Sequence, residues 1–438
     1  MGDPETETLD FTSYLAESQR LIDWAPGYTG PEMIYLCLTH ESCDLDSVVS
    51  TLAIAYLRYC NKGCLPHFYV PVLDMQRSDF PVKTEVCFLL AKQGIRAETH
   101  LTFRDDLAEE LLLKSRFILI NHHVSPFHYC AEEVYDYRSF QSEAARLPTY
   151  CQRVMYPVRS CAALAAARYA NSMSNYASVR CVQVFELLHA ALLLTNRNFK
   201  TIPVAKLRFF QDYRMMHFLE RYLGKLRDDQ RTILYNTLVR SIFDLSHLSL
   251  PQILRREFKI VKASRYIKDD IRTMRMLQCC FPMALTRFIA FENAEMAIRE
   301  FAGHFGCSFV LMLGTSIRPG GSLVVKELAV IPVDGLIELE HRRFFDHLII
   351  NLCAANKPQL DLEPYRNLDF MQGGYFFVNA WNIYYYTVLD LLQRICYDFI
   401  TDGGADIKEE LEAEQRSAEE KKKGKRKPKL KIKFVVSK

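Results

Sequence analysis

The sequence has no apolar run long enough to cross a membrane, since none approaches the roughly 18 residues that a spanning helix needs. Its first residues, MGDPETETLD, are acidic and lack the basic and apolar regions of a signal peptide. It also has no Cys-x-x-Cys pair and no internal repeat. We therefore expect no membrane span, a cytoplasmic or nuclear location, and an ordinary globular fold.

The fourteen cysteines lie scattered among apolar segments, without the spacing of a small disulfide framework. A chain of 438 residues, 49% of them hydrophobic, is long enough for a sizeable core and two domains. Because such a chain does not depend on disulfides, we expect the cysteines to be reduced and mostly buried. Cys60 and Cys64 suggest a zinc site, but no second pair completes one, so we interpret both as structural residues.

The charge of the chain is unevenly distributed. The whole chain carries a net charge of +3, while residues 408–438 contain twelve Lys or Arg and six Glu, or +6, which leaves −3 for the remainder. The stretch KKKGKRKPKLKIKF is broken by Gly424 and Pro428, and we expect a disordered tail over 406–438. Such a tail contacts nucleic acid, acidic surfaces or a nuclear import receptor, or is a solvated end without a partner.

Strand and helix patterns alternate through the first half of the chain. An amphipathic helix is expected over 11–22, within an N-terminal lead-in over 1–30. Strands are then expected over 34–38, 67–73, 98–103 and 117–120, and helices over 47–60, 81–93, 105–114, 161–170, 178–194 and 207–240. Later come a helical pattern near 285–304 and strands over 308–314 and 323–331. This rhythm predicts an α/β fold with a mainly parallel sheet flanked by helices.

Polar residues follow the first expected strand, 34–38, directly. His40, Asp44 and Asp46 lie between that strand and the helix that begins near 47. Because ligands bind at the C-terminal ends of strands in open α/β sheets, these three side chains are candidate ligands of a divalent cation. An equally good interpretation is that Asp44 caps the helix and that Asp46 lies in its first turn, where negative charge is favourable.

The strand over 117–120 also ends in potential metal ligands, Asn121-His122-His123. A strand followed by D-x-D and another followed by N-H-H resemble the DHH phosphoesterase superfamily. The segments THESCDLDSVVSTLAIAYL, FYVPVLDMQRSDFPVKTEVCFLL, FILINHHV and PVRSCAALAA are similar to its prune-type branch. That branch comprises the exopolyphosphatase and phosphodiesterase relatives of family II inorganic pyrophosphatases. The resemblance extends from about Met33 to Gln393.

The resemblance implies a DHH domain over 31–215, a linker over 216–235 and a smaller α/β domain of the DHHA2 type over 236–405. It also implies hydrolysis of phosphoanhydrides with two Mn²⁺ or Mg²⁺ ions, which bind the phosphate and lower the pKa of a bridging water. Two dications so close repel strongly, so carboxylates must bridge or surround them.

The sequence departs from the family at several of the metal-ligand positions. Asn121 replaces the Asp of D-H-H, Tyr137 replaces the His of D-H-R, and Thr195 replaces a later Asp. An amide carries no charge, and a tyrosine oxygen is protonated at neutral pH. We therefore expect at most one Mn²⁺ or Mg²⁺ ion, held by residues of the remaining candidate set: His40, Asp44, Asp46, Asp74 and His122.

Other residues are candidates for substrate contacts. His122 and Arg138 are the catalytic candidates, the latter from the D-H-R motif. Arg255, Arg256 and Lys259 belong to a segment that keeps the form of the family's second-domain signature, and they are candidate phosphate contacts. Exposed helix charges would look the same in the sequence.

Three functional interpretations follow. In the first, the chain is catalytically impaired and acts as a binding or regulatory protein for a phosphate-bearing small ligand or for partners such as nucleoside diphosphate kinase, as the resemblance implies. In the second, it is an active exopolyphosphatase or phosphodiesterase whose metal site is rearranged, with Asp74, Asp79 and Asp136 replacing the missing ligands. In the third, it is a nucleic-acid or nuclear adaptor that acts through its basic tail.

Overall fold

The computed structural model divides the chain into two compact units, Met1–Arg256 and Glu257–Lys438. The described residues are 9–24, 33–62, 65–138, 146–172, 181–200, 206, 210–224, 228–267, 270–317, 324–365, 367–380, 383 and 387–401. The tail expected over 406–438 lies outside them, as do parts of the expected lead-in over 1–30.

The division between the units falls later than the sequence indicates. The linker expected over 216–235 is mostly helical where it is described: residues 216–223 and 228–235 belong to two helices of the first unit. Residues 236–256, expected in the second domain, also belong to the first unit. Arg256 contacts residues 82–85 of that unit, which gives a physical reason for the later division.

The first unit is built on a six-stranded sheet with the order β3-β2-β1-β4-β5-β6. Every pairing in it is parallel. The strands are β1 (Met33–Leu38), β2 (His67–Leu73), β3 (Thr102–Phe103), β4 (Arg116–Ile120), β5 (Ala131–Asp136) and β6 (Gln152–Met155). The strand order reverses between β1 and β4, and such a topological switch point is where open α/β sheets bind ligands.

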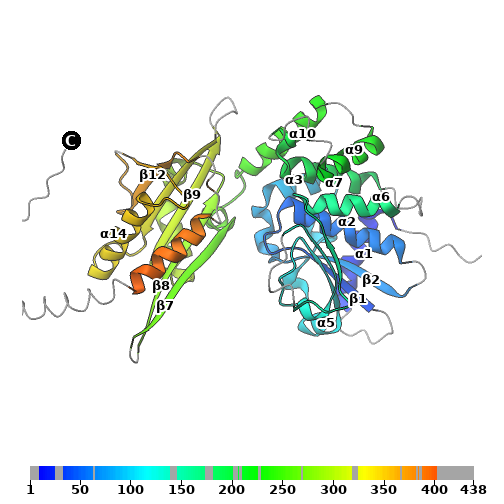
Figure 1. Ribbon diagram of the computed structural model, residues 1–438, viewed down its shortest axis with the longest axis horizontal. Coiled ribbons are helices and arrows are strands. Elements are labelled where there is room, and N and C mark those ends of the chain that lie inside the picture. The colour runs from blue at the N-terminus through cyan, green and yellow to red at the C-terminus, as the bar shows by residue number, and fades with distance from the viewer. Residues whose placement is uncertain are drawn as a thin grey trace, which may run out of the picture. The chain divides into compact units, whose positions relative to one another are not determined.

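Helices surround this sheet, as Figure 1 shows. The α-helices are α1 (Phe11–Trp24), α2 (Leu45–Asn61), α3 (Thr84–Lys92), α4 (Ala97–His100), α5 (Glu109–Lys114), α6 (Cys161–Ser172), α7 (Val182–Thr195), α9 (Gln211–Leu223), α10 (Asp228–Phe243) and α11 (Leu250–Arg255). Short 3₁₀ segments are η2 (Arg77–Val82), η3 (Arg104–Asp106), η4 (His128–Cys130) and η7 (Arg197–Phe199).

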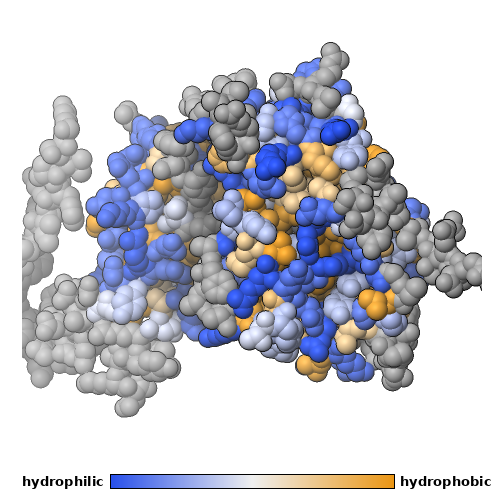
Figure 2. Space-filling model, turned by 45° about the vertical axis from the view of Figure 1, so that its right-hand side comes forward, coloured by the Kyte–Doolittle hydropathy of each residue, from blue (hydrophilic) through white to orange (hydrophobic). Residues whose placement is uncertain are grey.

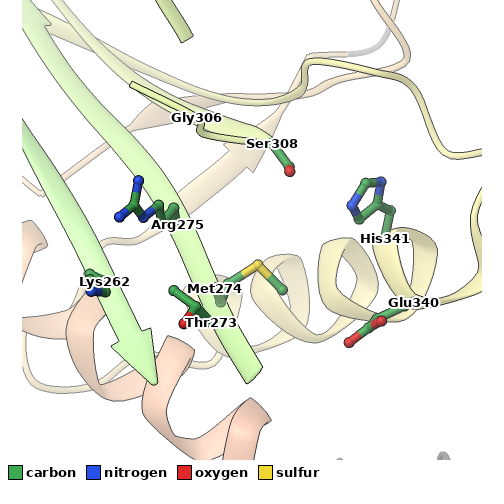
Figure 3. Close-up of a pocket in the computed structure, with 8 residues that line it drawn as sticks. All are labelled: Lys262, Thr273, Met274, Arg275, Gly306, Ser308, Glu340 and His341. Carbon is green, nitrogen blue, oxygen red and sulfur yellow. The ribbon is translucent and has the colours of Figure 1, made fainter. Parts of the chain in front are cut away.

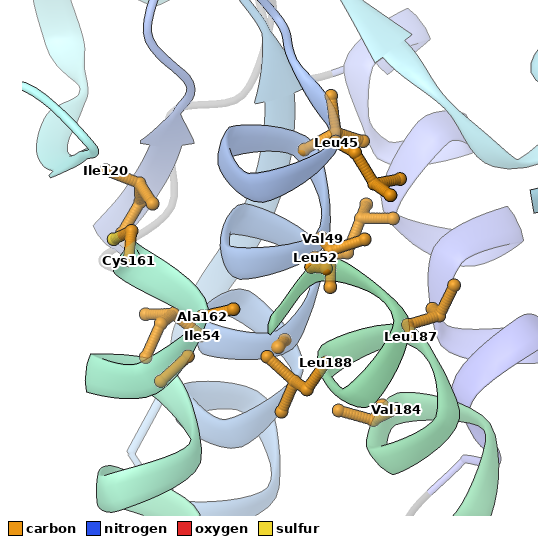
Figure 4. Close-up of a cluster of buried hydrophobic side chains, with 14 of the residues drawn as sticks. Leu45, Val49, Leu52, Ile54, Ile120, Cys161, Ala162, Val184, Leu187 and Leu188 are labelled. Carbon is orange, nitrogen blue, oxygen red and sulfur yellow. The ribbon is translucent and has the colours of Figure 1, made fainter. Parts of the chain in front are cut away.

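Two hydrophobic clusters cover the two faces of the first sheet. Ile118 and Ile120 of β4 pack into one cluster with α2, α6 and α7, as Figure 4 shows for part of it. Phe117 and Leu119, which alternate with them along the strand, pack into the other cluster with residues of α1 and α5. A parallel sheet buried on both faces produces the continuous apolar runs seen in its strands.

The second unit contains a six-stranded sheet with the order β11-β12-β10-β9-β8-β7, in which only β8 and β9 pair in parallel. Its strands are β7 (Phe258–Ile267), β8 (Asp270–Phe281), β9 (Phe309–Ile317), β10 (Val324–Pro332), β11 (Leu362–Pro364) and β12 (Gly374–Val378). Its helices are α12 (Leu285–Ile289), α13 (Ala294–His304) and α14 (Leu339–Cys353), and residues 387–401 are also helical. Phe344 and Leu348 of α14 pack into the core of this unit.

The predicted fold class, a mainly parallel sheet flanked by helices followed by a second α/β domain, is confirmed. The strand predicted over 98–103 is wrong at its start, because residues 97–100 form a helical turn and only Thr102–Phe103 pair with β2. The single helix predicted over 207–240 is instead the two helices α9 and α10.

No described helix is both long enough and apolar enough to span a bilayer. The thirteen described cysteines are all free and mostly buried, as expected; Cys64 lies outside the described residues. Exposed large hydrophobic side chains are spread over many elements, and on the face in Figure 2 they lie among hydrophilic residues. Single exposed hydrophobic residues of this kind are ordinary on protein surfaces.

Candidate functional site

The two polar motifs lie at neighbouring strand ends. β1 and β4 are adjacent and parallel, with Leu38 in register with Leu119. The segment that carries His40 follows β1, and Asn121 follows β4. Because both strands point the same way, the residues after them meet at one edge of the sheet, at the switch point. The prediction that these motifs share a site is consistent with this arrangement.

Asp44 and Asp46 both bind backbone N–H groups at helix starts. Asp44 is the N-cap of α2, and its Oδ1 accepts a hydrogen bond from Ser47 N at 2.8 Å. Asp46 is buried and accepts hydrogen bonds from Cys161 N at 2.7 Å and Ala162 N at 2.9 Å, at the start of α6. The capping interpretation of Asp44 therefore holds, and Asp46 links α2 to α6.

The Asp46 carboxylate also accepts a hydrogen bond from the hydroxyl of Ser160, so both of its oxygens are engaged. Burial, and next the nearby Asp44 carboxylate, raise the pKa of Asp46 to about 7, while the three hydrogen bonds oppose that shift. A metal ion at Asp46 would therefore compete with hydrogen bonds that hold the start of α6.

Two histidines face each other between the strand ends. The rings of His40 and His122 lie with their centroids 5.8 Å apart in an edge-to-face arrangement. His40 Nδ1 accepts a hydrogen bond from Ser42 N at 3.0 Å. His122 is buried, which lowers its pKa to about 4, so the ring is neutral at physiological pH. Its Nδ1 lies 3.0 Å from the carbonyl oxygen of Ile120 and donates to it, which leaves the Nε2 lone pair as an acceptor.

Asn121 occupies a left-handed backbone conformation with φ of +64°, which asparagine tolerates better than most residues. Its backbone N–H donates to Tyr135 O at 2.7 Å and its side-chain amide donates to Ser47 Oγ at 2.7 Å. The residue that replaces the family's bridging Asp thus ties β4 to β5 and to α2. A side-chain amide that donates in this way cannot act as an anionic bridge.

A buried carboxylate organises the residues after β5. Asp136 is fully buried, and its Oδ2 lies 2.6 Å from His123 Nδ1, which donates to it. Its Oδ1 accepts from the backbone N–H of Tyr137 at 2.8 Å and from the Arg138 guanidinium at 3.1 Å. Arg138 also donates to the backbone carbonyl of Asn121. The guanidinium therefore places a positive charge beside Asn121.

The remaining departures from the family pattern lie as follows. Tyr137 is partly buried, and burial together with the nearby carboxylate of Asp46 raises its pKa above the ordinary value, so its hydroxyl stays protonated. Thr195 is the last residue of α7 and is exposed. Asp74 Oδ1 lies 3.7 Å from Arg104 Nε, so this candidate ligand already has a cationic partner.

The three candidate phosphate contacts lie in different settings. Arg256 donates to Glu85 Oε2 at 2.7 Å and to the carbonyl of Val82, and its side chain is only 10% exposed. Arg255 lies 3.4 Å from Asp79. Lys259 belongs to β7 in the second unit. Arg256 thus serves internal contacts in the first unit, and a phosphate role for it has no support in this geometry.

The predicted ligands do not converge on a metal position. Among the described residues, no group of three or more His, Cys, Asp or Glu side chains lies as a metal-binding set. Asp46 contacts α6, Asp74 faces Arg104, and His40 and His122 face each other. The residues as they lie therefore do not fit the two-ion group that the resemblance implies.

Two features of this site were not predicted. The sequence VRSCAAL was recognised by its resemblance, but its role as the donor group for Asp46 was not; a serine before an alanine-rich helix is a signal that could have shown it. The His123–Asp136 pair was also missed, because thirteen residues separate its members and only the β4–β5 pairing brings them together.

The resemblance to the prune-type branch was compared with known protein families and known proteins. No protein-family model matches the chain. Exopolyphosphatase PRUNE1 of Bos taurus is 30% identical over 238 residues, which make up 52% of this chain and 49% of that protein. The Homo sapiens protein of the same name is 29% identical over 237 residues, with the same shares. Over about half of its length, this chain is similar to prune proteins.

The chain spans about half the length of the curated relatives it matches. Among solved structures, a Methanococcus jannaschii protein assigned as a family II inorganic pyrophosphatase is similar with a TM-score of 0.46 and 15% identity. That similarity covers 83% of this chain and 99% of the other. The similarity to prune proteins therefore rests on the sequence match alone.

Proposed function

We propose that this prune-like chain is a binding or regulatory protein in which the family's two-metal hydrolysis is impaired. The observation that carries the proposal is the side chain of Asn121, whose amide donates a hydrogen bond to Ser47 Oγ at 2.7 Å. Where the resemblance implies a carboxylate between two cations, this chain has a neutral amide.

Electrostatics supports this proposal. Two dications a few ångströms apart need several anionic oxygens, because their mutual repulsion is large even at an effective dielectric constant of about 20. Here Asn121, Tyr137 and Thr195 supply no negative charge. The Asp46 oxygens are engaged by donors at the start of α6. Substitution of residues that only contact a metal ligand typically reduces activity roughly 10–100-fold. Loss of the ligands themselves should reduce activity by more than that.

The contacts of the three stand-in carboxylates argue against a rearranged active site. Asp74 lies near Arg104, Asp79 near Arg255, and Asp136 between His123 and Arg138. Each is already paired with a cationic or hydrogen-bonding side chain. If one of these carboxylates bound a metal, its present pair would be broken. The free-energy cost of breaking the pair is greater the more deeply the pair is buried.

The chemistry of the site favours a phosphate-bearing ligand. Arg138 is about one-third exposed, and it can offer N–H groups to a phosphate as well as to Asp136. The neutral His122, with its free Nε2 acceptor, would accept a hydrogen bond from a ligand hydroxyl. In this proposal Arg138 binds the ligand phosphate and His40 and His122 orient the ligand, without turnover. Partners of the nucleoside diphosphate kinase type, implied by the resemblance, are part of the same proposal.

The test is phosphate release and metal content of the purified full-length chain. Release from polyphosphate, pyrophosphate and a cyclic nucleotide is measured with Mn²⁺ or Mg²⁺, with Asp44→Ala as the matched control. We expect release no faster than that of Asp44→Ala, and at most one ion per chain after gel filtration in Mn²⁺. Manganese-stimulated turnover that Asp44→Ala abolishes would refute the proposal.

A further inference from the structure

A cavity of about 340 Å³ lies in the second unit, whereas the strand-end residues belong to the first. Strands β7 and β8 form one side of it, and the turn before β9 and the start of α14 form the other, as Figure 3 shows. Its lining residues are Lys262, Thr273, Met274, Arg275, Gly306, Ser308, Glu340 and His341.

The strand register explains why this space is open. β9 begins at Phe309, which pairs with Met276 of β8. The β7–β8 pairing continues beyond that point, so Thr273 and Arg275 lie past the start of β9. Gly306, with φ of +61°, turns the chain into β9. The hairpin therefore extends beyond the sheet and leaves a hollow beside it.

Two cations lie directly opposite each other in this hollow. Lys262 of β7 and Arg275 of β8 are register partners in the antiparallel pair, and both are exposed. Like charges directly opposite on neighbouring strands destabilise a sheet. Within the part of the chain that the structure describes, neither side chain has a carboxylate within ion-pairing distance; Arg275 donates to the carbonyl of Phe305 at 3.5 Å. A bound anion would neutralise this repulsion.

The opposite wall offers further hydrogen-bonding groups. Ser308 and His341 face the two strands across the cavity (Figure 3). His341 packs edge-to-face on Phe309, with centroids 5.5 Å apart. The N-cap of α14, Glu338, makes no side-chain hydrogen bond to the first turn of that fifteen-residue helix. Glu338 Oε2 lies 3.8 Å from His341 Nε2, and Glu340 follows in the first turn, so this wall offers hydrogen-bond acceptors while the positive charge comes from Lys262 and Arg275.

We propose that this cavity binds a small phosphorylated molecule with hydroxyl groups, such as a sugar phosphate. Its phosphate lies between Lys262 and Arg275, and its hydroxyl groups reach Ser308 and the carboxylate of Glu340. The volume is at the lower end of the range for small-molecule sites, which suits a ligand of that size. Two cationic side chains against one carboxylate leave the lining positive overall, so a neutral sugar is disfavoured.

This site differs from the phosphate contacts predicted from the sequence. Lys259 lies three residues before Lys262 on β7, so the two side chains project from opposite faces of the strand. Val261 and Ala263, which flank Lys262, are buried in the core of the second unit. Lys262 therefore points away from that core, on the other face from Lys259. The proposal does not depend on the function proposed for the first unit.

The experiment is a calorimetric titration of the full-length chain with glucose 6-phosphate, inorganic phosphate and glucose. The variants are Lys262→Gln, Arg275→Gln and the double substitution, with Arg287→Gln on α12 as the matched control, because Arg287 is exposed and does not line the cavity. We expect glucose 6-phosphate to bind more tightly than inorganic phosphate, and glucose not to bind. Each cavity substitution should weaken binding by about tenfold or more, as for a lost charge-assisted hydrogen bond.

The same titration is carried out with Arg138→Met, a substitution at the strand-end site of the first unit. If glucose 6-phosphate binds in the cavity of the second unit, its affinity for this variant should be unchanged. Ser308→Ala keeps both cationic side chains. It should weaken the binding of glucose 6-phosphate by a few fold and leave the binding of inorganic phosphate almost unchanged. Circular dichroism confirms that each variant is folded. The proposal is overturned if wild-type protein does not bind glucose 6-phosphate, if the double substitution binds as wild type does, or if Arg287→Gln weakens binding equally.

Discussion

His123 Nδ1 and Asp136 Oδ2 lie 2.6 Å apart in a pair that is almost completely buried. The pair joins the end of β4 to the end of β5, and Arg138 completes it on the other carboxylate oxygen. A buried carboxylate is stable only when such partners offset its lost hydration. The pair therefore fixes the shape of the strand-end site.

Asp136→Asn should lower the free energy of unfolding by about 3 kcal/mol, because it removes the buried charge that pairs with Arg138 and accepts a hydrogen bond from His123, without changing side-chain size. Urea denaturation monitored by circular dichroism measures the change. Glu110→Gln, at an exposed position of α5, serves as the control and should change the free energy by no more than about 0.5 kcal/mol. A loss below about 1 kcal/mol for Asp136→Asn would show that the pair is not important for stability.

Asp46→Ala should destabilise the chain more than Asp44→Ala. The first substitution leaves buried N–H groups of Cys161 and Ala162 without an acceptor, at a cost of about 2–3 kcal/mol. The second removes a single N-cap, which is worth about 1 kcal/mol. Thermal unfolding of the two variants side by side gives the comparison. Equal or reversed losses would mean that Asp46 does not anchor α6.

Arg256→Ala should cost about 2–3 kcal/mol of unfolding free energy, because it removes a nearly buried ion pair with Glu85 and the contacts to Val82 and Thr84. Its neighbour Arg255 is a natural control: Arg255→Ala loses a more exposed pair and should cost about 1 kcal/mol or less. Urea denaturation again measures both. A phosphate contact would give the opposite pattern, with weaker phosphate binding and unchanged stability for Arg256→Ala.

Restoring the family's carboxylates should restore metal binding. Asn121→Asp alone adds one negative charge beside Ser47 and Arg138, and we expect Mn²⁺ affinity to rise by about tenfold or more. The triple substitution Asn121→Asp, Tyr137→His and Thr195→Asp should bind further metal and release phosphate from polyphosphate. Calorimetry with Mn²⁺ and a phosphate-release assay measure the two effects. If the triple variant binds no more Mn²⁺ than wild type, the missing carboxylates are not what limits the site.

The sequence predicted the parallel core of the first unit well, because β1, β2 and β4 are short apolar runs separated by helical patterns. It did not predict β7 and β8, in which charged residues alternate with apolar ones and Gly or Pro is absent from both strands. Such a pattern becomes a strand only through pairing with its neighbour, a tertiary effect that local propensity does not include. The same reason explains why the cavity beside that hairpin was not anticipated.

Within the candidate site, the sequence identified the polar residues but not their contacts. His40, Asp44 and His122 were recognised from their place after strands, which the sheet order supports. The engagement of Asp46 by α6 depends on a helix 114 residues or more away in the chain. No spacing rule connects positions so distant, so the difference between a metal ligand and a helix anchor appears only in three dimensions.

The left-handed backbone at Asn121 has an evolutionary consequence. Only a few residue types accept that conformation at low cost, and Asp is among them along with Asn and Gly. Codons for Asn and Asp differ by one base in the first position. A single transition at this position would therefore return an acidic side chain that suits the same backbone conformation.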